Sequence, residues 1–303
     1  MKTPRAEYPN PQFERKDWIN LNGKWDFEID NSKSGVERGI LDRPLASKIT
    51  VPFCPESSLS GVGNTDFMYS VFYRRTFDLD GKRLAAGRVF LHVGACDFDT
   101  TVWINKKEVG RHVGGYSHFS FDITKFAVEG ENVIDIRAFD DTLSRRQPTG
   151  KQSLRLLSHG CEYTRTTGIW QTVWLEFVPN SYIKNFKIYP SVEDCSATVQ
   201  LELCGRGALS AVAKYEGAVV GAAELDAAEY TATLKIELSE LHLWELGAGR
   251  LYDLELKFGD DTVKSYFGMR SVALDSAFKL NGKKTFQRLV LDQGFYPDGI
   301  YTA

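Results

Sequence analysis

The sequence predicts an all-β protein built from two antiparallel β-sandwiches. Three observations lead to this prediction. Apolar and polar residues alternate with period two in most apolar runs, so each strand has one buried face and one wet face. No window longer than about ten residues shows helical periodicity. The pattern of the chain changes at Pro179-Asn180-Ser181, which predicts a boundary between two domains.

The predicted strands of the first sandwich are separated by turn residues. Leu21-Asn22-Gly23-Lys24 is the first of these turns, and Asp80-Gly81 ends the second strand. In chain order the strands cover residues 25–29, 70–79, 88–94, 100–105, 118–123, 132–140 and 172–178. This succession favours an antiparallel sandwich over residues 1–180.

The second sandwich is predicted from short strands at roughly ten-residue spacing. These strands cover residues 182–192, 197–205, 208–217, 230–238, 251–259 and 262–272. Their spacing is typical of an immunoglobulin-like sandwich, here over residues 181–274. The Cys…Trp…Cys pattern of antibody domains is absent, so the prediction concerns the architecture alone.

The last residues, 275–303, have a different pattern. Asn281-Gly282 stands between two alternating arms over residues 278–287, which is the strongest short signal for a hairpin. RLVLDQ (288–293) is predicted to be a short apolar strand. A buried strand needs neighbours on both sides, so we expect this chain to be part of a longer protein.

Composition excludes several classes of function. The chain has 303 residues and a formal net charge of -3, which disfavours binding to nucleic acid or to an anionic membrane. It contains no apolar run long enough for a transmembrane helix and no apolar stretch near its start that would serve as a signal peptide. An odd, scattered set of cysteines predicts reduced thiols and a cytoplasmic location. These are Cys54, Cys96, Cys161, Cys195 and Cys204.

Motifs for phosphate, metal and nucleophile chemistry are absent from the sequence. There is no GxxxxGK[ST], no HExxH and no GxSxG. Four acidic residues near predicted strand ends suggest a calcium site, but turn hydrogen bonding explains them more simply. They are Asp97, Asp99, Asp140 and Asp141. We therefore expect neither a metal nor another cofactor.

Several long motifs, in order, resemble glycoside hydrolase family two, the family of β-galactosidases, β-glucuronidases and β-mannosidases. LNGKWDF, VPFCPESSLSG, HVGACDFDTTVWINKKEVGRHVGGYSHFSFDIT and TTGIWQTVWLE resemble its N-terminal sugar-binding domain. LWELGAGRLYDLELKF with YFGMRSV resembles the end of its immunoglobulin-like domain, and FKLNGKKTFQRLVLDQGFYPDG resembles the start of its (β/α)₈ barrel. The resemblance implies a jelly-roll (galactose-binding-like) sandwich, an immunoglobulin-like sandwich and a truncated barrel start.

The resemblance also implies retaining hydrolysis of β-glycosides by two glutamates about 5–5.5 Å apart. In this family both glutamates stand at the ends of later barrel strands, which places them beyond Ala303. We therefore expect the non-catalytic N-terminal portion of a β-glycosidase, most similar to β-galactosidases and inactive by itself. Its expected partners are a β-glycoside substrate and the missing barrel, and a homo-oligomer is compatible with the sequence. The alternative is a stand-alone, lectin-like carbohydrate-binding module.

Glu162 is the main candidate for contact with substrate. The resemblance implies an acidic residue six positions before Gly168 that faces the barrel and touches sugar hydroxyls. The family residue is usually aspartate, and the alternative for Glu162 is a solvated loop glutamate. Tyr163 and Arg165 flank it and are candidates for the same substrate rim, although a packing role is favoured for both. Val71 occupies the place where β-galactosidases have a substrate-binding asparagine, so that contact is expected to be missing.

Overall fold

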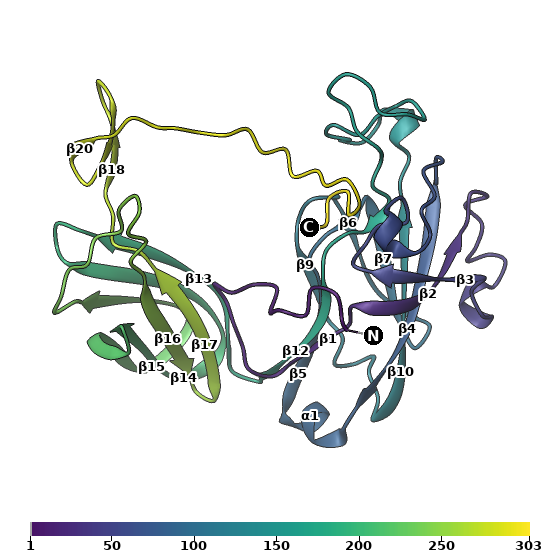
Figure 1. Ribbon diagram of the computed structural model, residues 1–303. Helices are drawn as coiled ribbons and strands as arrows, with labels where there is room; N and C mark the ends of the chain where they lie inside the picture. Colours follow the sequence, from purple (N-terminus) through teal and green to yellow (C-terminus); the bar gives the residue numbers. More distant parts are fainter. Residues whose placement is uncertain (1) are drawn as a thin grey trace. The chain divides into compact units, whose positions relative to one another are not determined.

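The computed structural model of the chain describes residues 2–303, and within this range nearly all regular structure is β-strand. The contacts divide these residues into two compact units. The first unit contains residues 2–9, 18–177 and 292–303, and the second contains residues 10–17 and 178–291. Figure 1 shows the strands of each unit. The prediction of an all-β fold is confirmed.

Two sheets form the first unit. The larger has the order β3 (Ser47–Val51), β2 (Gly23–Ile29), β4 (Ser70–Leu79), β10 (Gly130–Phe139), β7 (Asp99–Ile104), β8 (Lys107–Val113). The smaller has the order β1 (Trp18–Asn20), β12 (Val173–Pro179), β5 (Gly87–Val93), β9 (Phe119–Asp122). All pairings within the larger sheet are antiparallel, and so are those of β1 with β12 and of β5 with β9, as the alternating runs predict. Helical structure is limited to α1 (Gly81–Ala86) and to the short 3₁₀ turns η1 (Ile40–Asp42), η2 (Ser58–Ser60) and η3 (Thr142–Ser144) among the described residues.

The core of the first unit consists of inward-facing residues from both sheets. Trp25, Tyr73 and Ile136 come from the larger sheet, and Leu91 and Leu175 come from the smaller one. Each of these side chains is buried. Burying large apolar side chains contributes about 1.5–3 kcal/mol each, so this core is the main source of stability in the unit. Alternating residues of the two sheets are thus buried between them, which is the sandwich that the sequence predicts.

A short two-stranded sheet joins the sandwich to its longest loop. β6 (Cys96–Asp97) pairs with β11 (Gly168–Ile169), with Gly168 opposite Asp97. Gly168 has a φ of 76°, and a Cβ atom at this position would collide with the Tyr73 hydroxyl. That hydroxyl accepts a hydrogen bond from the Ile169 amide (N···O 3.2 Å). Glycine is therefore required at the point where the long loop enters β11.

The second unit is built around one long hairpin. Its sheet has the order β13 (Tyr182–Ser191), β14 (Ser196–Tyr215), β16 (Tyr252–Phe258), β17 (Asp261–Phe267), and β15 (Ala218–Glu237) pairs with β14. The sequence predicts two separate strands over residues 197–205 and 208–217, whereas the structure has one continuous strand. The register shifts between Glu202 and Arg206, where Gly205 has a φ of 87°. The glycine that signals a turn in the sequence therefore forms a bulge.

The bulge divides β14 into two parts with different partners. The part before the bulge pairs with β13, and the part after it pairs with β16. Leu201 and Leu203 from the first part share a core with Leu209, Ala211 and residues of the other strands. The unit is therefore sandwich-like, although its strands are connected through a single hydrogen-bonded sheet.

The hairpin predicted over residues 278–287 is present as β19 (Phe278–Leu280) and β20 (Lys283–Lys284), with β18 (Val272–Leu274) beside it. Asn281 and Gly282 both have positive φ, 51° and 75°, as a two-residue hairpin turn requires. The strand predicted over residues 288–293 is wrong, because this segment has no strand pairing. Leu289, Val290 and Leu291 are 80–92% exposed there. An apolar run forms a strand only where another strand pairs with it, and none pairs with this segment in the described residues.

The contact division differs in three main places from the predicted ranges 1–180, 181–274 and 275–303. Residues 10–17 and 275–291 belong to the second unit, and residues 292–303 belong to the first. Within residues 2–303, no helix has the length and hydropathy needed to cross a membrane.

Candidate substrate-facing site

Glu162 lies in the long loop between β10 and β11, residues 140–167. Backbone hydrogen bonds run in both directions between His159 and Glu162 (N···O 3.1 and 2.9 Å), so Gly160 and Cys161 form a tight turn between them. Oε2 of Glu162 lies 3.5 Å from Nε2 of His159, and the Glu162 side chain is 40% exposed. The carboxylate is therefore held by a turn, and its exposed oxygen surface can accept hydrogen bonds from ligand hydroxyls.

Tyr163 connects the loop to the C-terminal segment of the first unit. Its hydroxyl donates to Gln293 (Oη···Oε1 2.8 Å), and Lys151 donates to the same oxygen (Nζ···Oε1 2.7 Å). The ring of Tyr163 stacks on Phe295 with a centroid distance of 4.3 Å. The structure therefore gives Tyr163 a packing role, and it lies beside Glu162 in the chain.

Arg165 is buried and holds the loop together. Its guanidinium donates to backbone carbonyls of Ser153 (3.2 Å), Arg155 (2.6 Å) and Leu156 (3.2 Å), and also to that of Thr65. The guanidinium carbon lies 4.1 Å from the centroid of the Phe67 ring, a cation–π geometry. Burial lowers the pKa of Arg165. Because its two terminal nitrogens donate to carbonyls of the protein, Arg165 shapes the loop.

Buried carboxyl groups of Glu56 and Asp140 support the end of this loop. Thr167 joins them, because its amide donates to Glu56 (N···Oε2 3.2 Å) and its hydroxyl donates to Asp140 (Oγ1···Oδ2 3.2 Å). Gln147 donates to the other oxygen of Asp140 (Nε2···Oδ1 2.5 Å). Burial raises the pKa of Glu56 to about 8 and that of Asp140 to about 6. Glu56 therefore holds a backbone amide of the loop end, and Asp140 holds the side chains of Thr167 and Gln147.

Asp97 is a third buried carboxyl group beside the same loop. Gln152 donates to it (Nε2···Oδ2 2.7 Å) and accepts from the amide of Thr166 (N···Oε1 2.9 Å). Burial, followed by the charge of Asp140, raises the pKa of Asp97 to about 8. The buried acids and Gln152 therefore hold the segment that carries the loop into β11.

The sequence singles out Glu162, whose contact with substrate stays a prediction, but it does not predict the buried cluster of Glu56, Asp97 and Asp140. Asp97 and Asp140 were noted as strand-end acids, but Glu56 gave no signal, because its burial arises from packing by distant segments. Asp99 pairs with Arg111, and Asp141 caps η3 by accepting from the Ser144 amide (3.2 Å). No group of three or more His, Cys, Asp or Glu residues in the range 2–303 could hold a metal ion.

Comparison with known proteins identifies the family. Residues 19–179 match the family described as "Glycosyl hydrolases family 2, sugar binding domain", and residues 181–270 match "Glycosyl hydrolases family 2". These matches cover more than half of the chain. The chain belongs to glycosyl hydrolase family 2. Its curated relatives include β-galactosidases and β-glucuronidases, and it corresponds to an N-terminal portion of such family 2 proteins.

Two curated relatives illustrate the similarity. A β-galactosidase of Thermoanaerobacter pseudethanolicus is 26% identical over 290 residues, which are 88% of this chain and 36% of the relative. The β-glucuronidase of Homo sapiens is 27% identical over 305 residues, which are 87% of this chain and 46% of the relative. This family 2 chain therefore spans between a third and a half of the length of these relatives.

Solved structures share the fold. A β-glucuronidase of an uncultured Clostridium species superposes with a TM-score of 0.78 at 23% identity, covering 96% of this chain and 51% of that one. A β-glucuronidase of Ruminococcus gnavus in complex with an N1-substituted uronic isofagomine gives a TM-score of 0.79 at 18% identity, covering 98% of this chain and 54% of that one. At these identities the comparison supports the fold.

Proposed function

We propose that this family 2 chain forms the substrate-facing, non-catalytic part of a retaining β-glycosidase. The observation that carries the proposal is the exposed carboxylate of Glu162, held in place by a loop that Arg165 fastens through backbone carbonyls. A carboxylate that accepts hydrogen bonds from two sugar hydroxyls would orient a pyranose ring. The two catalytic glutamates would belong to a (β/α)₈ barrel elsewhere in the complete enzyme.

The favoured substrate is a β-galactoside, and a β-glucuronide is the second candidate. The first is supported by the similarity to the Thermoanaerobacter β-galactosidase, and the second by the β-glucuronidases among the relatives. Ratios of kcat/KM for the nitrophenyl β-galactoside and β-glucuronide, measured with the complete enzyme, decide between them. A large ratio in favour of the glucuronide would contradict the galactosidase assignment.

In the complete enzyme, Glu162→Gln should lower kcat/KM by about ten- to a hundredfold, because one charged hydrogen bond to the sugar is lost. The exposed position of Glu162 predicts that the melting temperature changes little. Steady-state kinetics and thermal denaturation measure the two quantities.

Glu108→Gln is the matched control, since Glu108 is an exposed residue of the same unit on β8. It should leave kcat/KM unchanged. If Glu162→Gln also leaves kcat/KM unchanged, Glu162 is a solvated loop residue with no contact to substrate.

The 303-residue chain alone should hydrolyse no nitrophenyl β-glycoside above background. The expectation rests on the family's mechanism, in which both glutamates lie on the barrel. Release of nitrophenol by the purified chain measures this. Turnover that a point substitution within the chain abolishes would contradict it.

A further inference from the structure

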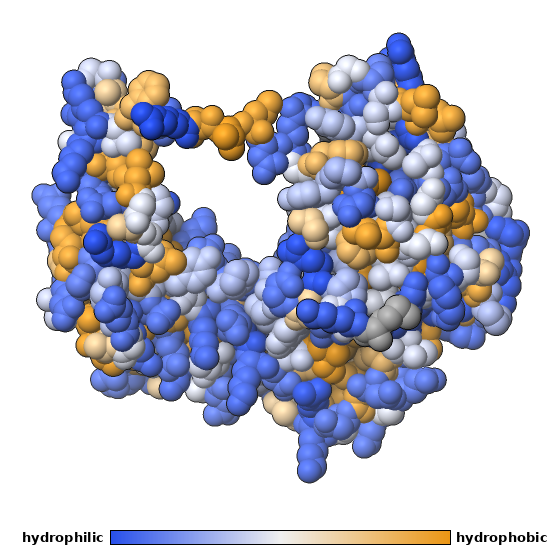
Figure 2. Space-filling model, in the orientation of Figure 1, coloured by the Kyte–Doolittle hydropathy of each residue, from blue (hydrophilic) through white to orange (hydrophobic). Residues whose placement is uncertain are grey.

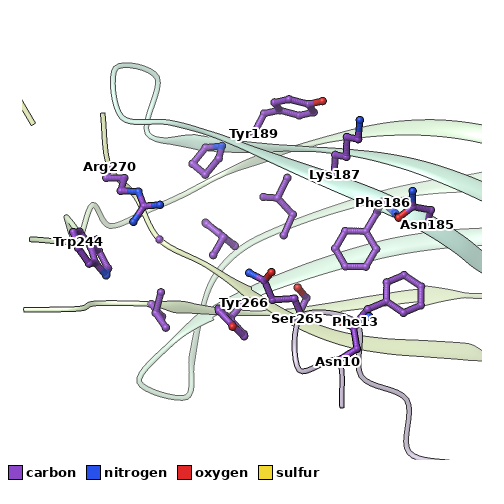
Figure 3. A pocket seen from close by; sticks show the side chains of 16 residues that line it. Asn10, Phe13, Asn185, Phe186, Lys187, Tyr189, Trp244, Ser265, Tyr266 and Arg270 are labelled. Atoms are coloured by element: carbon purple, nitrogen blue, oxygen red, sulfur yellow. The ribbon is translucent and has the colours of Figure 1, made fainter. Parts of the chain in front are cut away.

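A groove runs along the second unit between the strands β13 and β17, with a volume of about 740 Å³. This lies within the usual range of small-molecule sites, roughly 300–1,000 Å³. Figure 3 shows aromatic side chains at both ends, with Phe13 and Phe186 at one end and Trp244 at the other. Phe13 and Phe186 stack with a centroid distance of 5.1 Å. Flat apolar surfaces therefore border the groove at both ends.

Positive charge borders the groove without any facing acid. Arg270 lies at the Trp244 end, with its guanidinium carbon 5.0 Å from the centroid of the indole ring. Within residues 2–303, Arg270 has no carboxylate within ion-pair distance, and no Asp or Glu lines the groove. Other exposed basic residues of this unit, such as Arg250 and Lys257, pair with a carboxylate. Arg270 is therefore available to an anionic group.

Polar groups able to bind hydroxyls line the same groove. Asn10, Gln12 and Asn185 contribute side-chain amides, and the first and last of these lie near the Phe13 end in Figure 3. Ser265 also lines the groove, is 7% exposed, and has an Oγ without a hydrogen-bond partner in the described chain. A buried hydroxyl without a partner is costly. A ligand that supplies a donor or an acceptor would satisfy it.

We propose that this groove binds an acidic oligosaccharide. The pyranose face of one sugar packs on Trp244, and its uronate carboxylate pairs with Arg270. Hydroxyls of the following sugars bind the amides towards the Phe13 end. A sugar presents both an apolar face and many hydroxyls, which fits a groove lined by both rings and amides better than a purely apolar ligand would. The proposal does not depend on the substrate contact proposed for Glu162, since all the lining residues belong to the second unit.

The test is a titration of the 303-residue chain with trigalacturonic acid, followed by NMR of the tryptophan indole N–H signals, of which there are six to resolve. Trp244→Phe assigns the Trp244 signal. Trigalacturonic acid should shift that signal in a saturable way and should bind more weakly as salt is raised. Arg270→Gln should weaken binding by about tenfold, because a charged contact to the carboxylate is lost.

Arg206→Gln is the matched control, because Arg206 is an exposed arginine of the same unit outside the groove. It should leave binding unchanged. Maltotriose, a neutral trisaccharide, and triglutamate, an acidic peptide, are the competing probes and should bind at least about tenfold more weakly. No binding of trigalacturonic acid, equal binding of either competing probe, or an Arg270→Gln variant with unchanged affinity would each overturn the proposal.

Discussion

Replacing Asp261 with alanine should lower the free energy of unfolding of the second unit by about 3–5 kcal/mol. Arg15 donates two hydrogen bonds to its carboxylate (Nε···Oδ1 and Nη2···Oδ2, both 2.8 Å). The Ile183 amide donates to the same carboxylate (N···Oδ2 2.8 Å). Both members of the ion pair are at most 5% exposed. Alanine would leave a buried guanidinium without its carboxylate partner.

Urea denaturation followed by hydrogen exchange of peptides from β13 and β17 measures this effect. Glu255→Ala is the control, because it breaks a much less buried pair with Lys257 (3.1 Å) in the neighbouring strand β16. The control should cost less than about 1 kcal/mol. If Asp261→Ala lowers the free energy of unfolding no more than Glu255→Ala does, the stabilising role given to the buried pair is contradicted.

Raising the pH from about 6.5 to 8 should destabilise the first unit, by up to about 1.4 kcal/mol per pH unit for each buried acid that titrates there. Burial raises the pKa of Glu56 and of Asp97 to about 8, from ordinary values of 4.5 and 3.8. Between the ordinary pKa of each acid and its raised pKa, the folded chain holds a proton that the unfolded chain has released. Stability is therefore full at low pH and falls as the pH approaches 8.

The window above pH 6.5 avoids two opposing effects. Burial lowers the pKa of His118 from 6.5 to about 4, so the unfolded chain holds the extra proton between these values and stability rises with pH there. Exposed acids whose pKa is lowered by a cation, such as Asp42 beside Lys106, stabilise the folded chain until the pH falls below their ordinary pKa range, far below pH 6.5. Above pH 6.5 the buried acids dominate.

Glu56→Gln should flatten this pH dependence by about one proton, because the amide keeps an acceptor for Thr167 but cannot ionise. Scanning calorimetry at several pH values measures the slope. Glu131→Gln, at an exposed position at the start of β10, should keep the wild-type slope. An unchanged slope in Glu56→Gln would show that Glu56 ionises alike in the folded and unfolded chain.

The strands of the first unit were predictable because each has one face in a core. The run over residues 70–79 coincides with β4, and its alternation places Tyr73 and Phe77 in that core. Prediction failed where local sequence does not decide pairing. Gly205 reads as a turn but forms a bulge, and the apolar run at 288–293 has no strand beside it.

The site was predictable only in part. The position of Glu162 came from family resemblance, since an exposed loop glutamate carries no distinguishing local pattern. Arginine is usually a surface residue, but Arg165 is buried and donates hydrogen bonds to carbonyls within residues 153–156 and to that of Thr65. Such burial depends on contacts up to 100 positions apart in the chain, which a local pattern does not contain. The same is true of Glu56, which receives its hydrogen bond from Thr167.

The grouping of residues 10–17 with the second unit has a consequence for how the protein is made. Arg15 leaves the ribosome early, but its partner Asp261 is 246 positions further along the chain. At about 5–20 residues per second, translation takes on the order of 12–50 seconds to cover that distance. During this time Asp261 is not yet available to form the native ion pair with Arg15. A gene fragment that begins at the domain boundary near residue 178 would lack Arg15 and Phe13, so the second unit is not a self-sufficient module for transfer to another protein.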